Sequence, residues 1–257
     1  MFKKIFSILS VLLFTSNVFC ETAIKRILDN KKIIVGLEAG NPPFEFKKPS
    51  GDLIGFDIDI ASELAKAMNV SVEFKEYKFV DLIPALDNDE IDIIISGMTK
   101  TLERALKVNF TEPYYKTGQT VVSTAKKKDV NLSELNKKEI TIGIQKGTTG
   151  ETAVKKFFPQ SNIKLYDNME NCGKDLVENK IDAFVYDKPL AEIFVKRYPE
   201  KTYIISGELT TEYYCFAVKQ GDFDFICWLN YFIDELIKSG EYNKIYKKWF
   251  IDKTWEK

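Results

Sequence analysis

Strand-like and helix-like segments alternate along this chain, and the alternation occurs twice. The first set has apolar or alternating stretches at 31–37, 70–77 and 91–96, separated by helical patterns at 56–68 and 80–86. The second set has strand-like stretches at 140–144, 163–167 and 181–186, with helical patterns after Gly150, at 169–178 and at 188–197. A strand–helix–strand order implies parallel pairing with helices covering the sheet. The sequence therefore predicts an α/β protein made of two consecutive units.

Two extended stretches without a helix of their own separate and follow these units. GQTVVSTA spans 118–125 and EYYCFAVK spans 212–219, and we interpret them as two strands that cross between lobes. We expect one lobe to comprise 21–117 with 217–257, and the other to comprise 118–216 including the two hinge strands. A cleft between two hinged lobes is the natural place for a ligand.

Two of the predicted helices carry recognisable end signals. Asp57 stands at the start of the 56–68 pattern, where we expect it to cap the helix. The last helical pattern is strongly amphipathic and is expected to end at Gly240. Its apolar positions are Phe225, Trp228, Leu229, Phe232, Ile233 and Leu236. We expect this helix to cover the first lobe, together with Ile245, Trp249 and Phe250.

The N-terminal twenty residues, MFKKIFSILSVLLFTSNVFC, have the pattern of a secretory leader. Lys3 and Lys4 precede an apolar run from Ile5 to Phe14, which is too short for a transmembrane span of about 20 apolar residues. We therefore predict an exported protein with a signal peptide at 1–20. Two alternatives remain open at Cys20: ordinary cleavage after it, or its retention as a lipidated first residue on the outer face of the membrane.

Composition excludes several kinds of chemistry. The chain of 257 residues contains no histidine, which removes His-based triads and zinc sites with His ligands. A formal net charge of −1 offers no basic patch for nucleic acid. Beyond the leader, Cys172, Cys215 and Cys227 lack metal-like spacing, and three thiols cannot all pair within one chain. We expect no metal, no redox cofactor and no nucleic-acid partner.

Polar loops follow the predicted strands, and one of them holds an unusual combination. SGMTKTLERALK begins directly after the apolar run Ile93–Ile95 and places Arg104 five residues beyond Thr99. In open α/β sheets, ligands bind outside the carboxyl ends of the strands. A guanidinium and small hydroxyl residues at such an end favour a ligand that carries a carboxylate.

Several of these segments, in order, closely resemble the polar amino-acid branch of the extracellular solute-binding proteins that serve ABC importers. The resemblance rests on VGLEAGNPPFEF, GDLIGFDIDIASELAKAM, DIIISGMTKTLERALKVNFTEPYY, IGIQKGTTGE, IDAFVYDKP and IDELIKSGEYNKIYKKWF. It covers essentially all of the chain after the leader. It implies the two-lobed periplasmic-binding-protein fold of type II, each lobe being a sheet flanked by helices. It also implies a monomer that binds a free L-amino acid and delivers it to a membrane permease.

The resemblance assigns roles to individual residues. Arg104 would bind the α-carboxylate of the amino acid, and Asp187 would pair with its α-ammonium group. Gly97 would offer its backbone and Thr99 its N–H and hydroxyl, while Thr149 would donate from the start of a helix in the opposite lobe. The other candidates for ligand contact are Glu38, Asn41, Phe79, Met98, Gln145 and Tyr186.

Ligand specificity depends on fewer of these positions. Glu38 lies where relatives often place an acid that meets a polar or cationic side chain, and Phe79 matches one aromatic wall of the pocket. Asn41 stands where many relatives have an aromatic residue. A buried carboxylate without a basic partner is costly, so Glu38 favours a cationic or amide-bearing ligand. We expect glutamine or a basic amino acid.

Two other functions are compatible with the same fold. An exported cyclohexadienyl dehydratase-like enzyme could use Glu38 as a general acid, although the sequence offers no second catalytic partner. A ligand-sensing module of a larger receptor is the other alternative, but the chain ends at Lys257, directly after the last predicted helix. We therefore expect a stand-alone receptor and no enzymatic activity.

Overall fold

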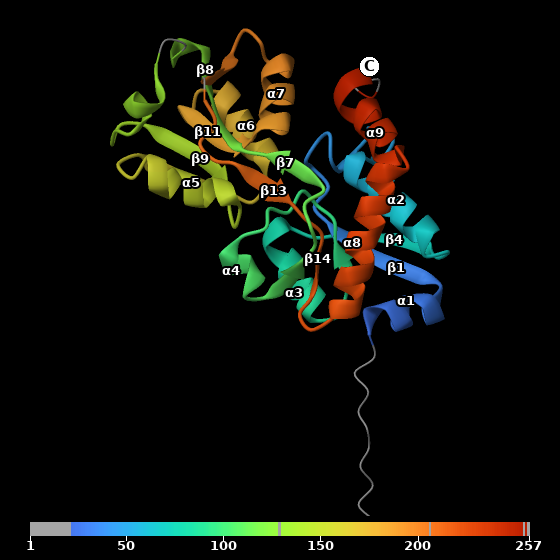
Figure 1. Ribbon diagram of the computed structural model, residues 1–257. Coiled ribbons are helices and arrows are strands. Elements are labelled where there is room, and N and C mark those ends of the chain that lie inside the picture. The colour runs from blue at the N-terminus through green and yellow to red at the C-terminus, as the bar shows by residue number, and fades with distance from the viewer. Residues whose placement is uncertain (1–21, 128–129, 206, 254, 256–257) are drawn as a thin grey trace, which may run out of the picture.

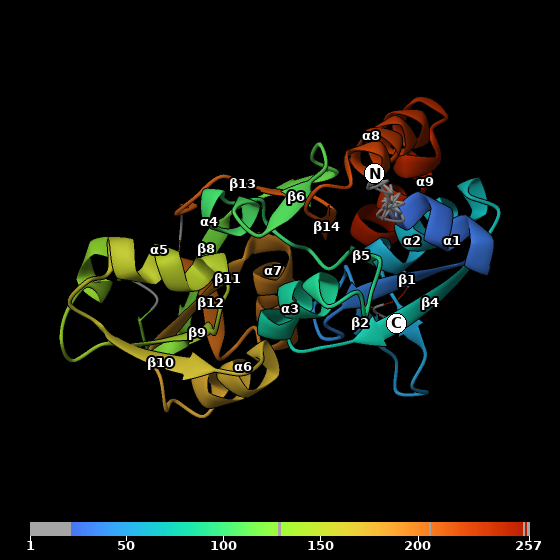
Figure 2. The ribbon, with the colours of Figure 1, turned by 90° about the horizontal axis from the view of Figure 1, so that it is seen from below.

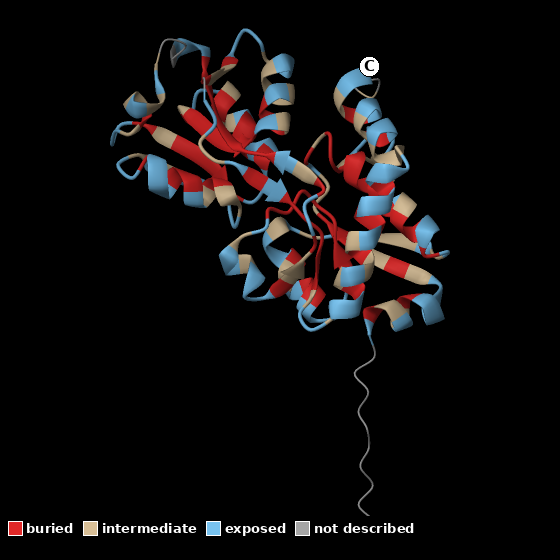
Figure 3. Cartoon of the chain, in the orientation of Figure 1, coloured by how far each residue is buried: buried red, intermediate tan, exposed pale blue. Residues whose placement is uncertain are grey.

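The computed structural model describes residues 22–127, 130–205, 207–253 and 255, and these form two lobes, each built on a five-stranded sheet (Figures 1 and 2). The leader predicted at 1–20, with its alternative outcomes at Cys20, lies outside the described residues. The α/β fold class predicted from the alternating segments is confirmed. Buried residues follow the strands of both sheets, whereas the outer sides of the covering helices are exposed (Figure 3).

The first sheet has the strand order β4-β1-β5-β14-β6. Its strands are β1 (Lys32–Leu37), β4 (Ser71–Glu76), β5 (Ile93–Ile94), β6 (Val108–Phe110) and β14 (Ala217–Lys219). β1 pairs in parallel with β4 and β5, whereas β14 runs antiparallel to β5 and β6. The central β5 is buried on both faces, which explains its continuous run of isoleucines. A two-stranded hairpin of β2 (Phe46–Lys47) and β3 (Leu53–Ile54) lies beside this sheet.

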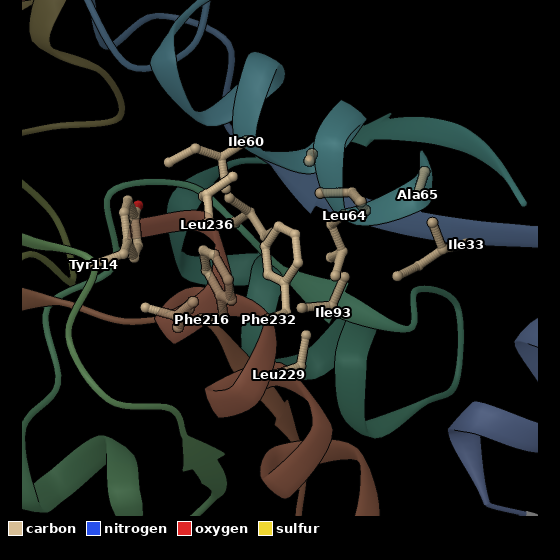
Figure 4. Close-up of a cluster of buried hydrophobic side chains, with 14 of the residues drawn as sticks. Ile33, Ile60, Leu64, Ala65, Ile93, Tyr114, Phe216, Leu229, Phe232 and Leu236 are labelled. Atoms are coloured by element: carbon tan, nitrogen blue, oxygen red, sulfur yellow. The ribbon is translucent and has the colours of Figure 1, made fainter. Parts of the chain in front are cut away.

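Helices from both ends of the chain cover the first sheet. They are α1 (Ala23–Asn30), α2 (Phe56–Ala67), α3 (Leu82–Asp87), α4 (Leu102–Ala105), α8 (Phe223–Lys238) and α9 (Glu241–Tyr246). In the core, Leu229 and Phe232 of α8 pack with Leu64 of α2 and Ile93 of β5 (Figure 4). The C-terminal segment therefore completes a core that includes residues about 140 to 170 positions earlier in the sequence. Helix α8 stops at Lys238, and Gly240 beyond it adopts φ +81°.

The predicted cap of α2 is wrong. Gly55 is the residue before the helix, and no side chain caps it. Asp57 lies inside the first turn, fully buried, where its Oδ2 accepts the Gly97 N–H at 2.8 Å and the Tyr114 hydroxyl at 2.9 Å. Gly55 itself adopts φ +149°, and a Cβ there would lie 1.8 Å from the carbonyl oxygen of Phe44. The close approach of the 44–45 backbone thus sets the start of α2, and Asp57 is left to bond the loop after β5.

The second sheet has the order β10-β9-β11-β8-β12. Its strands are β8 (Gln119–Thr124), β9 (Thr141–Gln145), β10 (Asn162–Tyr166), β11 (Ala183–Asp187) and β12 (Thr202–Ile205). Its helices are α5 (Thr149–Phe157), α6 (Met169–Val177) and α7 (Lys188–Arg197). β9 pairs in parallel with β10 and β11, and β8 runs antiparallel to β11 and β12. Helix α5 begins at the predicted Thr149.

Two short strands join the lobes, but one of them lies earlier in the chain than the sequence suggests. β7 (Tyr115–Thr117) pairs antiparallel with β13 (Glu212–Tyr214), and both lie between the two sheets in Figure 1. The β-branched run at 118–125, expected to cross between lobes, instead forms β8 inside the second sheet. Every residue of β8 is buried between β11 and β12, so burial on both faces accounts for its composition.

Candidate functional site

Loops at the carboxyl ends of four parallel strands meet in the cleft between the lobes. Glu38 follows β1, the segment from Gly97 to Arg104 follows β5, Gln145 ends β9, and Asp187 ends β11. An inner pocket of about 20 Å³ lies among them. It is lined by Glu38, Asn41, Glu45, Phe79, Ser96, Gly97, Thr99, Arg104, Thr148, Thr149, Tyr186 and Asp187. A wider outer cleft of about 760 Å³ shares Phe79, Thr99, Arg104, Thr148 and Thr149 with this pocket.

Nine of the eleven residues predicted from the sequence line the inner pocket. The other two are Met98 and Gln145. Met98 lines the outer cleft and is almost fully buried in a cluster with Leu82 and Ile94. Gln145 is buried beneath the pocket, and its amide reaches the pocket residue Glu38. The structure therefore brings the predicted set to one place.

Arg104 extends from the first lobe to the second. Its Nη1 donates to the Thr99 carbonyl at 2.7 Å, and its Nη2 donates across the cleft to the Gly147 carbonyl at 2.9 Å. The guanidinium carbon lies 5.0 Å from the centroid of the Phe79 ring, within the range of a cation–π contact. Burial lowers the pKa of Arg104, while the charges of Glu212 and Asp187 raise it. The guanidinium is thus held between two acids at the boundary of the lobes.

Asp187 is a buried acid whose hydrogen bonding is incomplete. Among the described residues, its Oδ1 has no hydrogen-bond partner. Burial raises its pKa from 3.8 to about 7, and the nearby charge of Glu212 adds to this rise. Hydrogen bonds with the Tyr214 and Gln119 side chains and the charge of Arg104 act in the opposite direction. An unpaired buried carboxylate oxygen is costly, and a cationic donor would relieve that cost.

The two threonines expected to donate to a ligand are already bonded to an acid of the hinge. Thr99 Oγ1 donates to Glu212 Oε2 at 2.8 Å, and Thr149 Oγ1 donates to the same oxygen at 2.7 Å. The N–H of Gly97 is likewise bonded, to Asp57. In this structure, protein carboxylates accept from all three groups, and their predicted contacts with a ligand remain a prediction.

Glu38 links the lobes at the far side of the pocket. Its Oε2 accepts from Gln145 Nε2 at 2.7 Å, and its Oε1 accepts the Phe79 N–H at 3.2 Å. Burial raises the pKa of Glu38, and these two hydrogen bonds act against the rise. The Tyr186 hydroxyl lies 3.4 Å from Gln145 Oε1. The hydrogen bonds that Glu38 accepts thus come from an amide side chain and a backbone N–H.

Two further acids lie at the pocket: Glu45 lines it, and Asp57 bonds the N–H of the pocket residue Gly97. Glu45 and Asp57 are both fully buried, and the charge of Asp57 contributes to raising the pKa of Glu45 after the larger effect of burial. Burial also raises the pKa of Asp57, to about 6. Glu45 Oε1 accepts from the Ser96 hydroxyl at 3.0 Å and from Asn41 Nδ2 at 3.4 Å. The pocket is therefore rich in carboxylates, and Arg104 supplies positive charge among them.

The comparisons with known proteins agree with this architecture. The family model for bacterial extracellular solute-binding proteins, family 3, matches residues 33–252. The chain belongs to this family. A Neisseria gonorrhoeae protein named "Probable histidine-binding protein" is 36% identical over 212 residues, covering 81% of this chain and 79% of that protein. The Escherichia coli ABC transporter arginine-binding protein 1 is 31% identical, over 86% of this chain and 91% of its own.

Solved structures of family members have the same fold. The crystal structure of an ancestral amino acid-binding protein, a precursor of cyclohexadienyl dehydratase, superposes with a TM-score of 0.85 at 35% identity. It covers 89% of this chain and 100% of its own. The predicted family and two-lobed fold are thereby confirmed.

Several site residues were missed by sequence reasoning: Glu45, Ser96, Gln119, Thr148 and Glu212. Only Glu212 carried a usable signal, since an acid at the start of the otherwise aromatic run EYYCF is unusual for a buried strand.

Within the described residues, no group of His, Cys, Asp or Glu side chains is arranged to hold a metal ion. In that same part of the chain, no helix has the length and apolar character of a membrane span. Cys172, Cys215 and Cys227 are free thiols.

Proposed function

We propose that this protein is an extracytoplasmic receptor that binds a polar L-amino acid between its lobes and delivers it to the permease of an ABC transporter. The observation that carries the proposal is the meeting of Arg104 from the first lobe and Asp187 from the second in one buried pocket. A guanidinium and a carboxylate in the lining of one small pocket match the two charges of a zwitterion. The names of the relatives, which bind histidine or arginine, support this proposal.

In this proposal, binding depends on movement of the lobes. Arg104 binds the α-carboxylate, assisted by the N-terminus of α5 at Thr149, where exposed N–H groups favour an anion. Asp187 receives the α-ammonium at its unpaired Oδ1. An inner pocket of about 20 Å³ has room for about one water molecule, so an amino acid enters only when the lobes separate. The hinge is the β7–β13 pair; of the described residues, 22–114 and those from 217 onward form the first lobe, and those from 118 to 211 form the second.

We infer that the side chain of the ligand is cationic or carries an amide. Glu38 and Glu45 line the pocket together with Asn41, and Gln145 lies behind them. These groups supply acceptors without a paired cation from the protein, which favours glutamine or a basic amino acid over an aliphatic one. Phe79, Tyr186 and Met98 supply the apolar part of the site.

The decisive experiment is calorimetric titration of the purified mature protein with each of the twenty amino acids. We expect binding of a basic amino acid or glutamine, and loss of that binding in Arg104→Ala without loss of the folded state. Arg197→Ala, at an exposed arginine of α7, is the matched control and should bind as the wild type does. Selective binding of aliphatic amino acids would refute the inferred ligand class, and near-native affinity in Arg104→Ala would refute the role of Arg104.

A dehydratase activity on the same fold is the second candidate. The raised pKa of Glu38 suits a general acid, and the ancestral structure above is a precursor of such an enzyme. We nevertheless propose a binding protein, because the curated relatives described above are named as binding proteins. Incubation with prephenate or arogenate, followed by detection of an aromatic product, would favour the enzyme.

We further propose that the protein acts as a monomer outside the cytoplasmic membrane. The mode of retention depends on Cys20, which is either removed with the leader or lipidated. Mass spectrometry of the exported protein distinguishes the two, because lipidation adds the mass of acyl chains to a polypeptide that begins at Cys20. Native mass spectrometry of the same sample would identify a co-purifying amino acid and the number of chains.

A further inference from the structure

Glu212 is a buried carboxylate that contacts both lobes from the hinge. It begins β13, and only 6% of its surface is exposed. Its Oε2 accepts the hydroxyl of Thr99 in the first lobe and that of Thr149 in the second, at 2.8 and 2.7 Å. Its Oε1 accepts the hydroxyl of Thr210 at 2.8 Å. One side chain of the hinge therefore bridges the two walls of the cleft.

These contacts use the groups that a ligand carboxylate would need. A threonine hydroxyl has a single hydrogen to donate, and both Thr99 and Thr149 donate theirs to Glu212. The Thr149 oxygen also accepts from Gln119 Nε2 at 3.1 Å, which fixes its orientation. The carboxylate of Glu212 thus has the bonding pattern expected for the α-carboxylate of a bound amino acid, beside the guanidinium of Arg104.

We propose that Glu212 is an internal competitor of the ligand: its carboxylate occupies the place of the ligand carboxylate and holds the two lobes together until an amino acid displaces it. Only the displacement of Glu212 by an amino acid rests on the proposed function. The bridge between the lobes is a property of the protein alone. The apparent affinity for amino acids is then the intrinsic affinity multiplied by the fraction of molecules in which Glu212 has left the site.

The outer cleft offers the displaced carboxylate a favourable position. Glu212 lines this wider space, and its volume of about 760 Å³ leaves room for the side chain to rotate away from the threonines. The walls of the outer cleft include four lysines, two from the segment around α4 and two from α5. They are Lys100, Lys107, Lys155 and Lys156. Glu103 and Glu151 also line this cleft, but with Arg104 the basic side chains outnumber them, so a carboxylate that leaves the threonines moves toward net positive charge.

The test uses Glu212→Gln, which keeps the size of the side chain and removes its charge. Glu208→Gln is the matched control, because Glu208 is exposed, lies four residues earlier and forms an ion pair with Lys188 at the protein surface. Two quantities are measured for each protein: the radius of gyration without added amino acid, by small-angle X-ray scattering, and the affinity for the amino acid that binds the wild type. Unfolding temperatures establish that each variant is folded.

We expect Glu212→Gln to have a larger radius of gyration than the wild type and to bind the amino acid about tenfold more tightly, since the competing charged hydrogen bonds are gone. Glu208→Gln should match the wild type in both. Weaker binding by a folded Glu212→Gln would overturn the proposal and make Glu212 a supporting residue of the site. An unchanged radius of gyration would also overturn it.

A third arm separates this inference from the proposed function. If no amino acid binds either protein, the proposed function fails, and an expanded Glu212→Gln would still support Glu212 as the bridge between lobes. If Glu212→Gln does not fold, Glu212→Asp replaces it. The shorter acid cannot reach both hydroxyls, so it should also expand the protein, and a wild-type radius of gyration in that variant would contradict the proposal.

Discussion

Replacing Asp187 by asparagine should stabilise the protein above pH 7 while abolishing amino-acid binding. Burial raises the pKa of this carboxyl from 3.8 to about 7. At pH values between these two, the carboxyl is protonated in the native state and ionised in the unfolded chain. Each tenfold change in proton affinity is worth about 1.4 kcal/mol, so the ionised form costs about 4 kcal/mol of stability above pH 7. Because the folded pKa is raised, this cost is absent below about pH 4 and grows as the pH rises.

The assay is thermal unfolding by circular dichroism of wild type and Asp187→Asn at several pH values from 4 to 8. The two proteins should unfold alike near pH 4, and the variant should be more stable by roughly 10 °C at pH 8, as about 4 kcal/mol implies for a chain of this size. The difference between the two proteins isolates Asp187 from the other buried acids. Asp81→Asn, at an exposed position, serves as the control.

Ligand binding gives the same reasoning a second readout. If Asp187 must be ionised to receive the ammonium group, wild-type affinity should be constant above pH 7 and should fall about tenfold for each further unit of pH below it. A stability difference between wild type and Asp187→Asn that does not change with pH would refute the reasoning, because it would mean that the buried carboxyl is not protonated near neutrality. Retained binding in the variant would refute the assigned partner of the ammonium group.

Three further predictions concern the pocket wall and the first lobe. Glu38→Gln should reduce affinity for a basic amino acid by tenfold or more in calorimetric titration, since one half-buried acceptor loses its charge; an unchanged affinity would place the ligand side chain elsewhere. Gly55→Ala should destabilise the protein by about 3 kcal/mol in urea unfolding, because its Cβ would lie 1.8 Å from the Phe44 carbonyl oxygen; wild-type stability would disprove this close approach. Phe44→Ala should cost about 3–5 kcal/mol in the same assay, since the fully buried ring contacts four other aromatic rings; a loss under 1 kcal/mol would contradict that packing.

The hinge illustrates where local sequence patterns stop being informative. The β-branched residues at 118–125 predict an extended segment, and β8 is extended. The pattern could not tell a crossing strand from a strand inside the second sheet, because both are extended and largely apolar. The choice was made by pairing with β11 and β12, whose residues lie about 60 to 80 positions further along the chain. The same limit applies to Asp57, whose partner Gly97 is 40 positions away.

The sequence by itself determined the alternation of strands and helices, the two units, and the polar loops that follow the strands. Those are properties of neighbouring residues, and periodicity of apolar side chains is enough to predict them. Through the resemblance to solute-binding proteins it also pointed to Arg104 and Asp187, both of which follow predicted strands. Only the tertiary structure decided that Glu212 from the hinge bonds both Thr99 and Thr149. That contact joins three segments more than 40 residues apart, and only the packing of both lobes on the β7–β13 pair brings them within hydrogen-bonding distance.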